Sequence, residues 1–163
     1  MPDGPRPTNG PRYDDDFYAW TQYQAEVLRS MPASDNRFDR ENVAEEIEDL
    51  GKNERNAVRS ELRRIVEHLL KLAHSPANDP RYGWMRSIVD ARETLEDRVT
   101  GTLRRDIETS LPRLYRGARR QAELSLLEFG ESNAANSLPA ECPYTLDQIL
   151  ADDWYPDPPG DPA

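Results

Sequence analysis

Apolar residues between positions 39 and 74 recur in steps of three and four, which is the spacing of one helix face rather than of a strand. No proline interrupts this stretch. We therefore expect one long central helix over about residues 39–74, roughly 50 Å in length at about 1.5 Å per residue. Its apolar positions are Val43, Ile47, Leu50, Val58, Leu62, Ile65, Leu69 and Leu72.

The register of this pattern shifts near the middle of the predicted helix. From Val58 to Leu72 the steps alternate between four and three, whereas between Leu50 and Leu62 every step is four, with Glu54 in line. Such a stutter rotates the apolar face of a helix. The carboxylate of Glu54 must then reach solvent or find a partner.

A shorter helical pattern precedes the central one. Residues 13–30 predict a helix, with Asp14, Asp15 and Asp16 suited to cap its N-terminus. After the turn that follows, Asp39 is a good cap for the central helix. The side chains expected to face inward from the first helix are Phe17, Trp20, Gln24, Val27 and Met31.

Two more helical patterns follow the central one. We expect the third helix to begin with Asp79 as cap and Pro80 at its first position, and to end near Gly101. The fourth covers about residues 103–127 and contains Pro112, which should kink or split it. Residues 129–140 predict a loop, and the capping box from Thr145 to Gln148 opens a short last helix. The predicted inward positions of the third and fourth helices are Trp84, Ile88, Ala91, Leu95, Val99, Leu103, Ile107, Leu111, Leu114, Ala118 and Ala122.

These elements predict an all-α fold, an antiparallel four-helix bundle with one long central helix. We expect a single domain over residues 13–155. Prolines concentrate at both ends of the chain, and we expect residues 1–12 and 156–163 to be a disordered leader and tail. The central helix is too long for the first helix to cover, so part of it either packs on the later helices or pairs with another subunit.

Composition narrows the function classes. The formal net charge is −10, from 31 acidic and 21 basic residues, which argues against broad charge-driven binding to nucleic acid or anionic lipid. The single cysteine, Cys142, cannot form an intramolecular disulfide. The N-terminal residues lack an apolar signal core, and no run is long enough to span a membrane. We expect an acidic, cytoplasmic protein.

Several short motifs occur in a fixed order along the chain, and together they are similar to those of a known bacterial family. This chain resembles domain of unknown function family 29, over about residues 13–155. The resemblance implies a small all-helical bacterial protein and carries no activity or catalytic residue. The motifs are Tyr13–Trp20, Asp39–Gly51 with Glu54, His68–Leu72, Trp84, Tyr115–Arg119, Cys142–Thr145 and Ile149–Leu150.

Polar residues on the central helix are the candidates for chemistry. Glu54, Glu61 and His68 lie seven residues apart on one line, about 10 Å per step, so no two of them can share a metal ion without ligands from other helices. A structural polar seam is the more frequent outcome for such a line. Glu46 borders the apolar stripe, and we expect Arg92 to pair across the bundle with Glu46 or Glu54. The predicted polar seam is therefore Glu46, Glu54, Glu61, His68 and Arg92.

Two further features could have a functional role, but a structural role is the more frequent one for such patterns. Arg113, Arg116 and Arg120 form a basic stripe on the fourth helix, which more often answers acidic neighbours than binds phosphate. Cys142 has no histidine nearby in sequence and is expected to be a packed thiol rather than a nucleophile.

The sequence favours a non-enzymatic helical module for protein–protein interaction or scaffolding, which binds a protein partner or associates with itself. The alternative is a small metal-assisted hydrolase or nuclease using the carboxylates of the central helix and His68. The pattern assigns no catalytic residue, metal ligand or cofactor, and it leaves open whether the protein is an enzyme.

Overall fold

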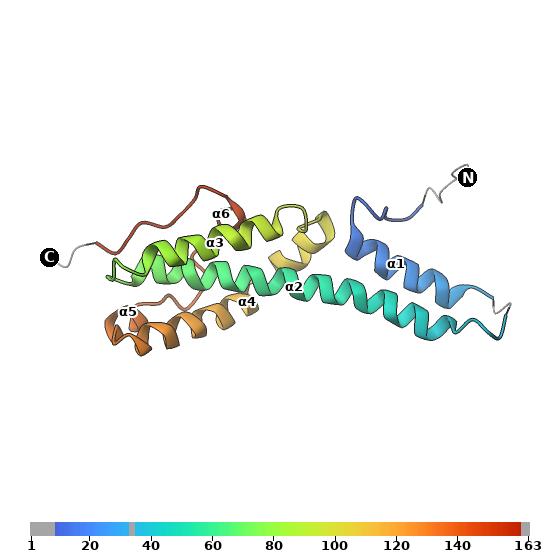
Figure 1. The fold of residues 1–163 in the computed structure, drawn as a ribbon, viewed down its shortest axis with the longest axis horizontal. Helices are drawn as coiled ribbons and strands as arrows, with labels where there is room; N and C mark the ends of the chain where they lie inside the picture. Colours follow the sequence, from blue (N-terminus) through green and yellow to red (C-terminus); the bar gives the residue numbers. More distant parts are fainter. Residues whose placement is uncertain (1–8, 33–34, 161–163) are drawn as a thin grey trace. The chain divides into compact units, whose positions relative to one another are not determined.

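The computed structural model of the chain describes residues 9–32 and 35–160, and within these ranges every regular element is a helix. The all-α prediction is confirmed. The four long helices match the four predicted patterns, and two short helices follow them (Figure 1). The elements are α1 (Phe17–Ser30), α2 (Arg40–His74), α3 (Arg81–Leu95), α4 (Gly101–Glu128), α5 (Ser132–Asn136) and α6 (Leu146–Leu150).

Asp16 fixes the start of two helices. Its Oδ1 accepts the backbone N–H of Ala19 at 2.9 Å, capping α1, and its Oδ2 accepts the N–H of Thr102 at 3.1 Å in the first turn of α4. Burial pushes the pKa of Asp16 upward, but the hydrogen bonds from Ala19, Thr102 and Thr100 outweigh it and hold this pKa below its ordinary value. The carboxylate therefore stays ionised and ties the start of α4 to α1.

The other helix ends also follow from local sequence. Asp39 accepts the N–H of Asn42 at the start of α2, as predicted. The predicted capping box is present: the Thr145 hydroxyl accepts the Gln148 N–H, and the Gln148 side chain accepts the Thr145 N–H. At the end of α4, Gly130 has a φ of 76°, a left-handed conformation that glycine adopts without strain.

Some boundaries differ from the sequence-based prediction. The residue before α3 is Pro80, which makes no side-chain cap, so Asp79 does not cap this helix. The helix ends at Leu95, and Gly101 begins α4 instead of ending α3. Pro112 does not split α4, which continues through it to Glu128. The predicted 129–140 loop contains the short helix α5.

The described chain divides into two compact units. Unit 1 is the described part of Met1–Ala57 with Thr100–Arg105, and unit 2 is Val58–Val99 with the described part of Asp106–Ala163. Helix α2 contributes its first half to unit 1 and its second half to unit 2. The single domain predicted over residues 13–155 stays a prediction. The predicted leader and tail lie outside the described residues at positions 1–8 and 161–163.

Unit 2 contains most of the large buried side chains. Arg59 of α2 makes a bidentate ion pair with Asp106 of α4, at 2.7 and 3.0 Å. Further along, the hydroxyl of Tyr115 and the guanidinium of Arg119 both donate to the carbonyl of Pro139, which holds the segment after α5 against α4. The core side chains of α2, α3 and α4 in this unit are Val58, Leu62, Ile65, Val66, Leu69, Leu70, Leu72, Ile88, Ala91, Leu95, Ile107, Leu114, Tyr115, Ala118, Ala122 and Leu126.

Candidate functional site

Helix α1 packs unusually closely against the first half of α2 (Figure 1). A Cβ atom added at Gly51 would lie 2.0 Å from the hydroxyl oxygen of Thr21, so only glycine fits at this crossing. The neighbouring contact residues Ala25 and Ala44 are small and fully buried. The two helices therefore meet through small side chains, which leaves the large ones on the flanks of the pair.

Polar contacts close one side of this helix pair. Arg29 bridges Glu41 at 3.1 Å and Glu48 at 2.8 Å, and the side-chain amide of Gln22 donates to the Glu48 carbonyl at 3.1 Å. Nearer the other end, the Arg55 guanidinium lies 5.8 Å from the ring centre of Tyr18. The order of these contacts along the two helices shows that they run antiparallel.

The opposite side of the pair carries apolar side chains that remain accessible. Met31 is 50% exposed, Val43 37% and Leu50 54%. Phe17, Trp20, Val27 and Ile47 are half-buried. We call these seven residues the apolar face: Phe17, Trp20 and Val27 of α1, Met31 directly after it, and Val43, Ile47 and Leu50 of α2.

Helix geometry places the six members of the apolar face that lie within α1 and α2 on the same side. On α1, Trp20 lies one residue before the buried Thr21, Val27 lies two residues after the buried Ala25, and Phe17 lies one turn before Trp20. On α2, the three face residues precede Ala44, Glu48 and Gly51 by one residue. One residue back is a rotation of about 100°. In an antiparallel pair, that rotation turns both helices toward the same side, away from Arg29 and its partners. The apolar face is therefore continuous across α1 and α2.

Aromatic contacts order one end of the apolar face. The ring of Tyr13 packs edge-on against Phe17 and Trp20, with ring centres 5.4 and 4.9 Å away. Phe17 and Trp20 stack with a centre distance of 6.2 Å. This end is preformed, while Met31 and Val43 at the other end are open to solvent.

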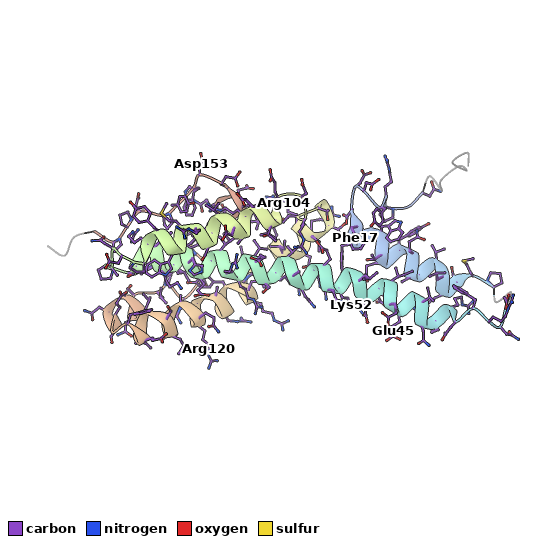
Figure 2. The ribbon with its side chains drawn as sticks, in the orientation of Figure 1. Phe17, Glu45, Lys52, Arg104, Arg120 and Asp153 are labelled. Atoms are coloured by element: carbon purple, nitrogen blue, oxygen red, sulfur yellow. The ribbon has the colours of Figure 1, made fainter. Side chains whose placement is uncertain are left out.

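The surroundings of the apolar face are acidic. Residues 13–57 contain twelve acidic and five basic residues. On α2, the face positions and their outer neighbours include Asp39, Glu46 and Glu54 and no lysine or arginine. Glu45 points away from α1 on α2 (Figure 2). The border of the face is thus mainly acidic, although Arg40 donates to the Met31 carbonyl at one end and Arg12 lies beside Tyr13 and Trp20 at the other.

Two members of the predicted polar seam lie in unit 1. Glu46 is exposed at the border of the apolar face, and Glu54 is half-buried and makes an interaction of its own. Two others, Glu61 and His68, lie in unit 2 on α2. The carboxylate of Glu61 is 3.3 Å from Arg64, and the Nδ1 atom of His68 is buried without a hydrogen-bond partner among the described residues. Whether these residues share a function stays a prediction.

Arg92 has different partners from those predicted. Its Nε donates to the Ile149 carbonyl at 2.9 Å, its Nη1 to that of Asp152 at 3.3 Å, and its Nη2 to those of Gln148 and Trp154 at 3.2 and 3.0 Å. The predicted pairing of Arg92 with Glu46 or Glu54 is wrong. The guanidinium instead holds residues 148–155, which we call the C-terminal strap.

Burying the charged side chain of Arg92 costs free energy unless its donors find acceptors. The side chain is only 4% exposed, and burial lowers its pKa, while Tyr155 and Asp152 oppose that effect. The guanidinium also lies 5.2 Å from the ring centre of Tyr155. A buried arginine is tolerated here because backbone carbonyls take up its donors.

A buried lysine near α3 was not predicted from the sequence. Lys71 is 5% exposed, with its Nζ 2.8 Å from Glu67 and 5.5 Å from the ring centre of Trp84. The four-residue spacing of Glu67 and Lys71 on one helix was the available signal. The pair supplies the partner that a buried ammonium needs, and we assign it a structural role.

The remaining sequence candidates also have clear positions. In the described chain, no group of three or more His, Cys, Asp or Glu side chains is arranged to hold a metal ion. Arg120 points outward from α4 (Figure 2), and Arg113 and Arg116 are exposed beside it. The thiol of Cys142 is half-buried and donates to the Tyr144 carbonyl, and burial raises its pKa.

No helix in the described chain has both the length and the apolar character that a membrane crossing needs.

His68 predicts a measurable pH dependence of stability. Burial, aided by Lys71 and Arg64 and opposed by Glu67, lowers its pKa to about 4. The unfolded chain, with a pKa near 6.5, then binds more protons between these two values. We expect the free energy of unfolding to fall as pH drops from about 6.5 to about 4, by about 1–2 kcal/mol for this partly accessible side chain.

The measurement is urea unfolding of the protein and of His68→Gln at several pH values in that window. The variant lacks the titrating group, so its stability should fall less steeply with decreasing pH. Parallel curves for the two proteins would show that His68 is not buried in its neutral form.

Comparisons with known proteins agree on family and fold and supply no activity. A family model described as a domain of unknown function, DUF29, matches residues 12–155. The chain is similar to the crystal structure of an alpha-helical protein of unknown function from Rhodospirillum rubrum, with 27% sequence identity and a TM-score of 0.78. That match covers 88% of this chain and 92% of the other. No curated protein matches the chain.

Proposed function

This chain belongs to the DUF29 family, and because that family carries no assigned activity, we propose from the geometry that it is a helical protein–protein interaction module. The observation that supports this is the apolar face of α1 and α2. Large apolar side chains at heptad spacing are accessible on two adjacent helices, whereas soluble proteins normally bury such stripes. A further helix laid between α1 and α2 would cover them.

Charge decides which occupant we propose. A second copy of the chain would place two acidic borders together, with Asp39, Glu46 and Glu54 contributed by each copy. Like charges brought together at an interface cost several kcal/mol. A basic amphipathic helix of another protein would instead match both the apolar stripe and its border. We therefore propose that the partner is a helix with apolar residues at heptad spacing and lysine or arginine on its flanks.

The second function suggested by the sequence is metal-assisted hydrolysis. Among the described residues, no group of three or more His, Cys, Asp or Glu side chains is arranged to hold the metal ion that it would require. Glu46 is exposed beside the apolar face, and its position fits recognition of a basic partner. We therefore propose binding as the role of this part of α2.

The test uses a synthetic helical peptide with leucine at the a and d heptad positions and lysine at the flanking e and g positions. We expect saturable binding that weakens as salt is added, because the flanking contacts are between charges. Leu50→Glu should weaken binding at least about tenfold, since it places a charge in the middle of the contact. Calorimetry and circular dichroism would measure binding and retained helicity.

The matched control is Leu124→Glu on α4, because Leu124 and Leu50 are both 54% exposed. This variant should bind the peptide as the unmodified protein does. A peptide of the same pattern with glutamate in place of lysine should not bind. Equal binding of both peptides, or equal loss in both variants, would contradict the proposal.

The mass of the protein in solution tests whether a second copy of the chain, rather than a basic helix of another protein, covers the apolar face. We expect a monomer at concentrations of about 10–100 μM, the range where weak homodimers form. A dimer that Leu50→Glu dissociates would show that a second copy occupies the apolar face, and would overturn the basic partner.

A further inference from the structure

A second surface, separate from the apolar face, lies on unit 2. Exposed side chains of α4 recur there in steps of three and four, so they share one side of the helix. Arg63 of α2 reaches the same side, because its Cδ atom is 3.5 Å from where a Cβ atom at Gly117 would stand. We call six residues the arginine–leucine face: Arg63 of α2 with Arg113, Arg116, Arg120, Leu124 and Leu127 of α4.

The four arginines of this face are exposed, and none of them pairs with a carboxylate among the described residues. Figure 2 shows Arg120 pointing away from the bundle. The neighbouring carboxylates each lie near another cation, in the pairs Arg59–Asp106 at 2.7 Å, Lys71–Glu67 at 2.8 Å and Arg119–Glu123 at 3.6 Å. Four unpaired guanidiniums on one side of a chain with a net charge of −10 form a local site for anionic groups from outside.

The other end of the face is apolar. Leu124 is 54% exposed and Leu127 46%. Leu124 follows Arg120 by one turn, so the apolar surface continues the line of guanidiniums. A single exposed leucine is ordinary, whereas two neighbouring ones in line with a charged stripe form a patch that a partner can cover. The face therefore has a basic first half and an apolar second half, with the exposed Glu128 directly after it.

This division into two halves decides between possible occupants. The backbone of a nucleic acid brings phosphates to the arginines but no apolar group to the leucines, and the net charge of the chain repels it. A second copy of the chain would offer the apolar face of unit 1, where the acidic residues flank the apolar ones instead of following them. A helix of another protein can carry carboxylates and apolar side chains in successive halves of one stripe.

We propose that the arginine–leucine face binds an acidic amphipathic helix of another protein. Its carboxylates, spaced three or four residues apart, pair with the arginines, and its apolar side chains pack on Leu124 and Leu127. From Arg113 to Leu127 the face is about 21 Å long, which matches about four turns of the partner helix. The binding site lies within unit 2, so it does not rest on the partner proposed for the apolar face.

The experiment is a calorimetric titration of the full chain with two synthetic helical peptides of about four turns. One has glutamate on a single stripe in its N-terminal half and leucine on the same stripe in its C-terminal half. The other has the halves exchanged, so the two peptides cover both directions of docking. We expect at least one of them to bind saturably, and to bind more weakly as salt is added. The glutamate-flanked heptad peptide described above should not bind, because its leucines run along its whole length and would cover the guanidiniums.

Four variants locate the binding. Arg120→Gln should weaken it about threefold or more, while Arg86→Gln, which replaces an exposed arginine of α3, is the matched control and should bind normally. Leu124→Gln changes no charge, so it tests the apolar half alone and should weaken binding about fivefold or more. Leu50→Gln is its matched control, because Leu50 is also 54% exposed. All four should keep their circular dichroism, since the replaced side chains are on the surface.

A DNA duplex of about 20 base pairs tests the nucleic-acid occupant, and we expect it not to bind at physiological salt. Duplex binding that Arg120→Gln weakens and Leu124→Gln leaves unchanged would overturn the acidic helix. A self-associated protein that Arg120→Gln dissociates would show that a second copy occupies the face, and would overturn it too. The proposal also fails if neither peptide binds saturably, or if the affinity is unchanged in Arg120→Gln or in Leu124→Gln.

Discussion

Replacing Arg92 with methionine is expected to release the C-terminal strap from α3. Methionine keeps much of the apolar length of arginine but supplies no donor, so the four backbone carbonyls bonded by Arg92 lose their partner. Buried carbonyls without donors are costly, and the strap avoids that cost by leaving its site and becoming hydrated. We expect the free energy of unfolding to fall by about 3–5 kcal/mol.

Urea unfolding would measure this loss, and hydrogen exchange would locate it in residues 148–155. Arg86→Met is the matched control, because Arg86 is exposed on the same helix and its loss should change stability by less than about 0.5 kcal/mol. Arg92→Lys keeps the charge but not the planar set of donors, so it should recover only part of the stability. Unchanged exchange in the strap of Arg92→Met would contradict the assigned role of Arg92.

Gly51→Ala is expected to separate α1 from α2 within unit 1. The new methyl group would lie 2.0 Å from the Thr21 hydroxyl oxygen and 2.7 Å from the Gln22 side-chain nitrogen. Thr21 is fully buried, so its short branched side chain has no open space to move into. We expect a loss of about 1–3 kcal/mol in the stability of the α1–α2 pair, although alanine favours helix more than glycine does.

The matched control for this substitution is Gly83→Ala in α3. A Cβ atom at Gly83 would meet nothing within 4 Å, so this variant should gain about 0.5–1 kcal/mol from helix propensity alone. Thr21→Ala combined with Gly51→Ala removes the clash and should restore part of the lost stability. Thermal unfolding of the three variants tests this, and a stabilised Gly51→Ala would show that the two helices are not in close contact at Gly51.

The helices themselves were predictable because their signals are local. Apolar spacing located α1 to α4, and the capping residues Asp16, Asp39 and Thr145 do what their side-chain chemistry predicts. On α2, the positions from Val58 to Leu72 that were predicted to be apolar and inward are all buried. Local rules failed at Gly101, because a glycine can either end one helix or begin the next, and here it begins α4.

The face that α1 presents to α2 was not predictable from periodicity alone. The large apolar residues indicated Phe17 and Trp20 as inward, whereas the buried contact residues are Thr21 and Ala25. Periodicity finds an apolar stripe but does not say what covers it. Gly51 was the missing signal, because a glycine inside a helix can mark a close approach that only small side chains allow.

The partners of Arg92 illustrate a second limit. Sequence reasoning sought a carboxylate, since ion pairs are the usual solution for a buried arginine. The guanidinium instead bonds backbone carbonyls more than 50 residues away, and a carbonyl leaves no signature in the sequence because every residue has one. The buried hydroxyl of Tyr144, which has no hydrogen-bond partner among the described residues, was hidden for the same reason, since a missing partner becomes visible only in three dimensions.

The position of Cys142 has a practical consequence. It is the only thiol in the chain, and the half-buried residue donates its thiol hydrogen to the Tyr144 carbonyl. Because burial raises its pKa, its reaction with an alkylating reagent should be slow while the segment is closed. The rate of alkylation then measures how often residues 140–144 open, and the measurement needs no engineered cysteine.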